Sequence, residues 1–247
     1  MAGVVLGGMD WVAGVALAVV LGVGWVLYQY SQTRRDLDLE AVARRLGLHF
    51  RSSLPAELRE LLPRFRAIET AMERGGDFRA GINSITGSWR DRKIAFFDYE
   101  WITVLPLPVY RSWWRGGYSP DSYRRTHRRS AVAIELGVGL QPVLIRPEHL
   151  LDKALAWAGY EDIDFDRLPE FSRAFYVNSP DRAAAERLVT STLAAFFLEN
   201  VRCTVDVVGP WMLLHEGRLL PARRVQDRMD LAGRLSELVT REQSGSR

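Results

Sequence analysis

The sequence contains little cysteine and little lysine. Cys203 is the single cysteine among 247 residues, and only Lys93 and Lys153 among the 33 basic residues are lysine. A single cysteine excludes an intrachain disulfide, which agrees with a reducing compartment. The preference for arginine, together with much alanine and leucine, indicates a GC-rich bacterial coding bias rather than a function. Cys203 lies within a predicted strand, where we expect a buried, unreactive thiol.

Motifs typical of catalysis, nucleotide binding and glycosylation are also absent. The sequence has no G-x-S-x-G, no P-loop and no Asn-x-Ser/Thr acceptor. Its histidines lack the H-x-x-x-H spacing and the cysteine partners that are typical of zinc sites. These histidines are His49, His127, His149 and His215. The motifs therefore predict no catalytic residues, no cofactor and no zinc site.

One acidic segment begins like a calcium-binding loop. Asp162, Asp164 and Asp166 place carboxylates at alternate positions. A calcium loop needs glycine at its sixth position and a bidentate glutamate at its twelfth. Arg167 and Arg173 occupy those two positions. We therefore expect these acids to pair with arginines rather than to bind a metal.

The long hydrophobic run of the sequence is residues 11–30, WVAGVALAVVLGVGWVLYQY. At a rise of about 1.5 Å per residue, a helix of this length spans roughly 30 Å, the hydrocarbon thickness of a bilayer. Trp11, Trp25, Tyr28 and Tyr30 lie near its ends, where aromatic rings prefer the headgroup level. A cleaved signal peptide is disfavoured because no basic residue precedes the run. A buried helix of a globular core is disfavoured because no polar stripe interrupts the run. We predict one transmembrane helix over residues 11–32.

The charges on either side of this helix predict its orientation. The N-terminal flank has no Lys or Arg, whereas Arg34, Arg35, Arg44 and Arg45 follow the run. Positively charged flanks tend to stay in the cytoplasm. We therefore expect a single-pass protein of the bacterial inner membrane, with its N-terminus outside and its soluble domain in the cytoplasm.

Small residues recur along one face of the same helix. Gly14, Ala18 and Gly22 are spaced four residues apart, which lets two helices approach closely. A homodimer through the membrane helix is one interpretation of this spacing. The other is that glycine and alanine are common in membrane helices, and we favour it because the pattern is frequent by chance.

The rest of the chain alternates between strand-like and helix-like segments. Strands are predicted over residues 81–88, 93–103, 130–136, 141–146 and 171–177, and in a hairpin of 201–208 and 211–215. Helices are predicted over residues 37–48, 54–72 and 147–159, from Asp181 onward, and over 225–239. This order indicates an α+β fold, a mainly antiparallel sheet with packed amphipathic helices. We divide the chain into a short tail (1–10), the transmembrane helix (11–32), a juxtamembrane helical segment (33–76), an α+β domain (77–241) and a disordered tail (242–247).

Four short motifs point to a group of related proteins. They are NSITG (83–87), FDYEW (97–101), VLIRPE (143–148) and FSRAFYV (171–177). Together they resemble a group of uncharacterised bacterial membrane-anchored proteins that contain a domain of unknown function. The resemblance covers about residues 48–240. It implies a bacterial single-pass protein and brings no activity, partner or site residue.

The most unusual soluble stretch is residues 110–129, YRSWWRGGYSPDSYRRTHRR, which we name the arginine–aromatic segment. It holds six arginines and one aspartate, a net charge of +5, whereas the rest of residues 31–247 is close to neutral. Arginine with aromatic rings suits an anionic bilayer surface or a protein interface, and nucleic acid is less favoured because no recognisable motif accompanies it. The alternative is a hairpin whose tryptophans pack on the sheet while its arginines are solvated. The candidate contact residues are Arg111, Trp113, Trp114, Arg115, Tyr118, Tyr123, Arg124, Arg125, Arg128 and Arg129.

Two hypotheses for the function follow. The favoured one is a non-enzymatic binding or scaffolding module at the inner-membrane surface, whose arginine–aromatic segment contacts lipid or a protein partner. The other is a membrane-anchored enzyme whose site contains Asp98, Glu135 and His127 on neighbouring strands. An enzyme needs a concave pocket where such groups converge. A binding module needs an exposed basic and aromatic patch.

Overall fold

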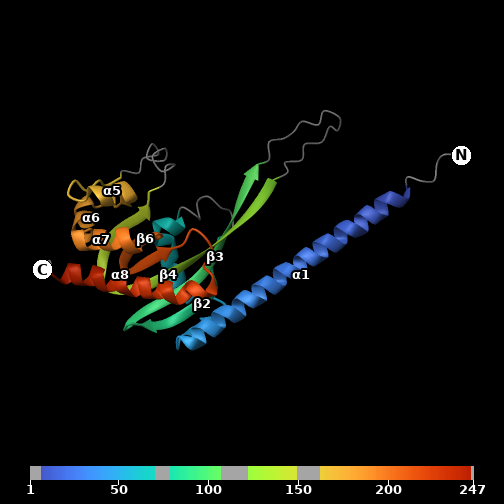
Figure 1. The fold of residues 1–247 in the computed structure, drawn as a ribbon, viewed down its shortest axis with the longest axis horizontal. Coiled ribbons are helices and arrows are strands. Elements are labelled where there is room, and N and C mark those ends of the chain that lie inside the picture. Colours follow the sequence, from blue (N-terminus) through green and yellow to red (C-terminus); the bar gives the residue numbers. More distant parts are fainter. Residues whose placement is uncertain (1–6, 70–77, 107–121, 149–161, 246–247) are drawn as a thin grey trace.

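The computed structural model describes residues 7–69, 78–106, 122–148 and 162–245. They form one six-stranded antiparallel sheet with helices on both faces, so the α+β class and the mainly antiparallel sheet are confirmed (Figure 1). The helical elements are α1 (Gly7–Arg45), α2 (Ala56–Leu61), η1 (Leu62–Arg64), α5 (Pro169–Ala174), α6 (Arg182–Leu188), α7 (Ser191–Asn200), η3 (Ala222–Arg224) and α8 (Val225–Gly245). The strands are β1 (His49–Arg51), β2 (Phe78–Trp89), β3 (Arg92–Pro106), β4 (Ser122–Pro147), β5 (Phe175–Asn178) and β6 (Thr204–His215).

Helix α1 is continuous over 39 residues and projects from the domain (Figure 1). Its C-terminal turns pack on the sheet through Leu39, Val42 and Ala43, which are buried, and Gly47 with a φ of +69° follows its end. The large apolar side chains described from Trp11 to Leu37 are exposed. The sequence-based division between a membrane helix and a separate juxtamembrane helix at residue 33 therefore does not correspond to a break in the backbone. Counted over the described residues, no helix is both long enough and apolar enough to cross a bilayer.

The sheet is built around the long strand β4. Strand β3 pairs with the first half of β4, from Pro106↔Ser122 to Ile94↔Ile134, and β5 pairs with its last residues. Strand β6 also pairs with β4, and β1 and β2 extend the sheet beyond β3. The β2–β3 turn consists of Arg90 and Asp91, both with positive φ, as a two-residue hairpin requires. The pairing of β3 with β4 therefore forms a long hairpin that extends from the sheet.

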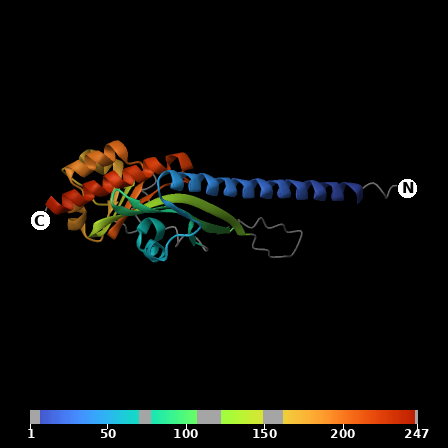
Figure 2. The same cartoon turned by 90° about the horizontal axis from the view of Figure 1, so that it is seen from below.

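The sheet has a hydrophobic core on each face. Residues at alternate positions of β3 and β4, such as Phe96 and Val132, pack with the C-terminal part of α1 and with α5 to α8. The residues between them, such as Phe97 and Ala131, pack with α2, η1 and the turn that follows. Figure 2 shows the sheet between these two helical layers. On β3 and on β4 up to Leu136, a residue therefore belongs to one layer or the other according to its parity, because side chains alternate along a strand. The register shifts after Glu135 reverse this parity, so Val143 and Ile145 lie in the same core as Val132.

Three sequence-based strand assignments are wrong. The strands predicted at 130–136 and 141–146 belong to the single strand β4, and the hairpin predicted around Gly209 is the single strand β6. Gly137 and Gly209 have positive φ and lie at the shift in register between β4 and β6, so they distort the strands without ending them. The strand predicted over 171–177 begins instead as helix α5 and becomes extended only at Phe175.

The helix predicted from Asp181 is two helices. Asp181 accepts a hydrogen bond from the Ala184 N–H at 3.0 Å and caps α6, as the sequence indicates. Thr190 then caps α7 by accepting from the Leu193 N–H at 3.3 Å, which separates the two helices. The terminal helix α8 is confirmed. The helix predicted over 54–72 is interrupted by η1, which contains Pro63. The helix predicted over 147–159 lies almost entirely outside the described residues.

Candidate functional site

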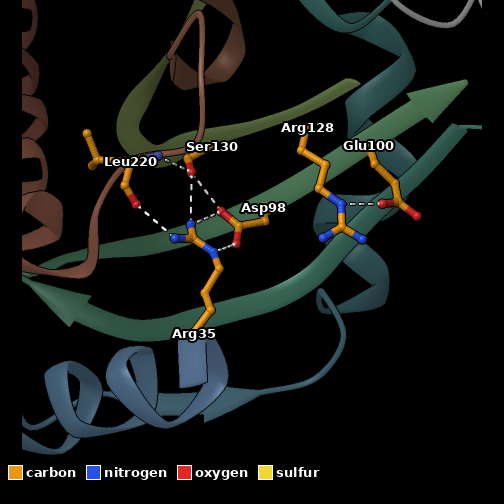
Figure 3. Close-up of polar contacts among 6 residues, drawn as sticks. All are labelled: Arg35, Asp98, Glu100, Arg128, Ser130 and Leu220. Atoms are coloured by element: carbon orange, nitrogen blue, oxygen red, sulfur yellow. Dashed lines mark hydrogen bonds and ion pairs between the residues drawn. The ribbon is translucent and has the colours of Figure 1, made fainter. Parts of the chain in front are cut away.

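The base of α1 is fastened to the sheet by a buried ion pair (Figure 3). Arg35 Nε lies 2.7 Å from Oδ2 of Asp98, and Arg35 Nη2 donates to Oδ1 at 2.8 Å. Ser130 donates to the same Oδ1 at 2.7 Å, and Arg35 Nη1 donates to the Leu220 carbonyl at 3.1 Å. We name these four residues the Arg35 cluster. They join α1, β3, β4 and the segment after β6, so one arginine holds four parts of the chain together.

A second ion pair lies beside the Arg35 cluster on the same face of the sheet. Arg128 Nε is 2.8 Å from Oε2 of Glu100, and Arg79 lies 3.9 Å from the other carboxylate oxygen of Glu100. These side chains line a cleft of about 650 Å³ between α1, the β1–α2 connection and strands β2 to β4, together with Asp36 and Asn83. Burial raises the pKa of Asp36 above its ordinary value, and the hydrogen bond with Asn83 opposes that rise. The cleft is polar and has charges of both signs.

The opposite face of the same strands carries an aromatic group. Trp101 stacks on His127 with ring centroids 4.8 Å apart, and the Arg129 guanidinium lies 4.7 Å from the Trp101 ring centroid. Arg129 also donates to Nε2 of His215 at 3.1 Å, which places the His215 proton on Nδ1, where it faces the hydroxyl of Tyr99. Burial, followed by the charge of Arg129, lowers the pKa of His215 to about 3, and burial raises that of Tyr99. His215 is therefore neutral and structural at physiological pH.

The arginine–aromatic segment is described only from Ser122 onward. Arg111, Trp113, Trp114, Arg115 and Tyr118 lie outside the described residues, and of Tyr123 and Arg124 only the backbone in β4 is described. Arg125 is exposed. Arg128 and Arg129 are part of the two groups described above, so they hold the base of the β3–β4 hairpin and do not form a free surface.

The structure does not bring together the three residues of the enzyme hypothesis. Asp98 faces α1, where Arg35 and Ser130 surround it. His127 stacks on Trp101, which belongs to the core of the opposite face. Glu135 has the same parity as His127 but lies eight residues further along β4, roughly 26 Å away at the rise of a strand. No concave site can form from these three side chains.

The described residues also offer no metal site. Among them, no group of three or more His, Cys, Asp or Glu side chains could hold an ion. Asp162 accepts a hydrogen bond from the Val177 N–H at 3.0 Å, so it pairs with the backbone of β5 rather than with an arginine. Cys203 is buried, and burial raises the pKa of its thiol to about 12, as expected for an unreactive cysteine.

The small-residue face of α1 has no neighbour among the residues that the structure describes. Nothing among the described residues lies within 4 Å of a Cβ built on Gly14 or on Gly22, and Ala18 is exposed. The homodimer through Gly14, Ala18 and Gly22 stays a prediction.

Comparison with known proteins identifies no family and one similar solved structure. No family model and no curated protein matches the chain. Among solved structures, the crystal structure of the mycobacterial trehalose monomycolate transport factor A, TtfA, is similar, with a TM-score of 0.49 and 14% sequence identity. The match covers 85% of this chain and 92% of that chain. At this similarity it carries no argument about function, and the resemblance to membrane-anchored bacterial proteins stays a prediction.

Sequence reasoning missed the Arg35 cluster. In the sequence, Arg35 belongs to the positive flank of the hydrophobic run and Asp98 to the residues of the enzyme hypothesis. Their partnership spans 63 positions of sequence. One available signal was that Asp98 interrupts a strongly aromatic strand, since a carboxylate in such a position is buried and needs a cation.

Proposed function

We propose that the protein is a single-pass membrane protein whose domain binds or scaffolds at the membrane surface through the tip of the β3–β4 hairpin. The observation that carries this proposal is an arrangement of two elements. The apolar part of α1 and the β3–β4 hairpin project from the same side of the sheet, as both views show (Figures 1 and 2). A membrane that surrounds α1 therefore lies on the side of the described end of the hairpin, where Pro106 pairs with Ser122.

The hairpin is long enough to reach that membrane. Arg35 contacts Asp98, so these two residues lie at one level of the molecule. Strand β3 continues for eight residues from Asp98 to Pro106, which is roughly 26 Å of extended chain. The edge of the apolar run at Tyr30 lies five residues from Arg35, or about 7.5 Å along the helix at 1.5 Å per residue. The hairpin is therefore long enough for its described end, Pro106 and Ser122, to reach the level of the lipid headgroups.

The membrane assignment of α1 rests on its side chains. From Trp11 to Leu27 every described side chain is exposed, and none of them is charged. Val12 and Tyr28 belong to the same helix and complete the run, although their side chains lie outside the described residues. Counted in the full sequence rather than over the described residues alone, the run of residues 11–30 has the length that the hydrocarbon core of a bilayer requires. The domain then lies in the cytoplasm, because Arg34 and Arg35 follow the run.

Lipid contact at the hairpin tip can be tested with the full chain in vesicles. Cys203 is buried with a raised thiol pKa, so a cysteine introduced by Ser112→Cys reacts selectively with an environment-sensitive dye. We expect its emission to shift to the blue when phosphatidylglycerol is mixed into phosphatidylcholine vesicles. The control is Glu186→Cys on α6, at the other end of the domain, where composition has no effect (Figure 1).

The arginines of the tip provide the second arm of this experiment. Arg111, Arg115, Arg124 and Arg125 are replaced together by glutamine, while Arg128 and Arg129 stay because they stabilise the fold. The blue shift of the dye should disappear. Equal emission in neutral and anionic vesicles for the unchanged tip would rule out lipid contact and favour a protein partner. A reporter fused after Arg247 tests the orientation separately, and activity on the periplasmic side would overturn it.

A further inference from the structure

A second basic surface lies away from the hairpin tip. A cleft of about 650 Å³ forms between the C-terminal end of α7, the segment that follows β6, and the first turns of α8. Its lining includes two acids and five arginines. The arginines are Arg202, Arg218, Arg224, Arg228 and Arg234. We name it the arginine cleft; its formal net charge is +3.

The two acids of the arginine cleft are already neutralised. Glu216 pairs with Arg228 at 2.5 Å, and Asp227 pairs with Arg224 at 3.1 Å. The Glu216–Arg228 pair is largely buried, and Arg228 also donates to the Cys203 sulfur at 3.6 Å, so this arginine is held in place. The excess positive charge therefore belongs to the other three arginines.

Those three arginines form no ion pair with a carboxylate among the described residues. Arg202 donates to the carbonyls of Leu198 at 3.0 Å and Val201 at 2.8 Å, which orients its guanidinium without neutralising it. Arg234 lies over the Phe196 ring at 5.8 Å. Among the described residues no carboxylate forms an ion pair with Arg218 or Arg234. Several arginines that share one cleft repel one another, so the arrangement favours an anion.

We propose that the arginine cleft binds a phosphate-bearing ligand. The planar guanidinium donates two parallel hydrogen bonds to phosphate oxygens, and a phosphate monoester brings up to two negative charges against an excess of three positive ones. The volume lies within the range of small-molecule sites, so it admits a phosphate together with the group that carries it. The positive end of the α8 dipole adds to the attraction.

The position of the arginine cleft allows two sources of phosphate. The Arg218 carbonyl accepts from the Ser130 N–H at 3.2 Å, and Ser130 belongs to the Arg35 cluster at the base of α1. If α1 spans a bilayer, the cleft lies near the level of the lipid headgroups. A lipid phosphate and a soluble phosphate ester are thus both sterically available. The proposal concerns a different surface from the hairpin tip and stands without it.

The test is a binding titration with the full chain in a neutral detergent. The probes are pyrophosphate and a short-chain phosphatidylglycerol, and the measurement is the dissociation constant by calorimetry. We expect the double variant Arg218→Gln/Arg234→Gln to weaken binding at least about tenfold, because charge-assisted hydrogen bonds are lost. The control Arg44→Gln/Arg182→Gln removes the same charge from exposed helix faces and should stay within about twofold of the unchanged protein.

The outcomes separate the sources and the alternatives. Binding of pyrophosphate, with or without the lipid, indicates a site for soluble phosphate, and binding of the lipid alone indicates a headgroup site; either supports the proposal. The variant Arg218→Lys keeps the charge but loses the paired donors, so it should weaken binding several-fold if the cleft is a built site. Binding of neither probe, or equal weakening in the control variant, would overturn the proposal.

Discussion

Arg35 and Asp98 form a two-bonded ion pair between the projecting helix and the centre of the sheet, at 2.7 and 2.8 Å. The Asp98 side chain is 6% exposed and that of Arg35 is 16% exposed, so solvent screens this pair little. A buried pair of this kind stabilises the fold only while both partners remain. The contact therefore adds to the apolar packing of Leu39, Val42 and Ala43 in holding α1 on the domain.

The first prediction concerns the loss of Arg35. In Arg35→Met, Asp98 keeps the Ser130 hydroxyl but has no cation, and we expect the free energy of unfolding to fall by about 3 kcal/mol. Denaturant unfolding of the full chain in neutral detergent, followed by tryptophan fluorescence, measures this loss. Arg44→Met is the control, because its pair with Glu40 is exposed and contributes at most about 0.5 kcal/mol. A similar loss in both variants would contradict the role of Arg35.

Gly81 provides a second prediction. Its φ is +69°, and an added Cβ would lie 2.3 Å from the Leu54 Cβ and 2.7 Å from the Leu54 nitrogen. Because backbone atoms cannot move aside as a flexible side chain can, Gly81→Ala should destabilise the protein by at least about 2 kcal/mol. Gly139→Ala is the matched control, since nothing lies within 4 Å of its Cβ position. Equal denaturation midpoints for the two variants would show that Leu54 does not pack against β2.

The buried carboxyl group of Asp206 should make the stability of the protein depend on pH. Burial raises its pKa to about 7, although the Ala67 N–H and the charge of Arg66 oppose that rise. The folded state thus holds a proton that the unfolded state releases above about pH 4, and stability falls as the pH rises from 4 to 7. Asp206→Asn should abolish this loss, which amounts to about 2–3 kcal/mol between pH 5 and 7. Denaturant unfolding curves of the unchanged protein and of Asp206→Asn at pH 5 and pH 7 measure this difference. An equal change in unfolding free energy for the two proteins would contradict the prediction.

Buried His215 should have the opposite effect and lower the stability of the protein as the pH falls. Its pKa of about 3 in the folded state means that the unfolded state takes up a proton first as the pH falls below about 6.5. The contribution of neutral His215 to the free energy of unfolding is complete above pH 6.5 and is lost progressively as the pH falls toward 3. About 2 kcal/mol of it is lost by pH 5. In His215→Gln this part of the acid sensitivity should disappear. The difference in unfolding free energy between the two proteins, measured at pH 7.5 and pH 5, isolates it from other groups.

The sequence predicted the elements better than their ends. The long run of strand-favouring residues in β3 and the long helical periodicity of α8 each predict one element, and the structure contains both. Gly209-Pro210 has the composition of a hairpin turn, but the pairing of β6 with β4 overrides that local preference. The Arg35 cluster is formed by parts of the chain that are distant in sequence, so spacing alone could not reveal it.

The unbroken backbone of α1 has a geometric consequence. Because no hinge separates its exposed turns from those packed on the sheet, the angle and the rotation of the helix determine the direction in which the domain faces. Each residue inserted between Tyr30 and Arg35 would turn the domain by about 100° around the helix axis and advance it by about 1.5 Å. A partner fixed in the surroundings of α1 would then meet a different side of the domain. The length of this helix, counted in single residues, thus sets which surface is presented.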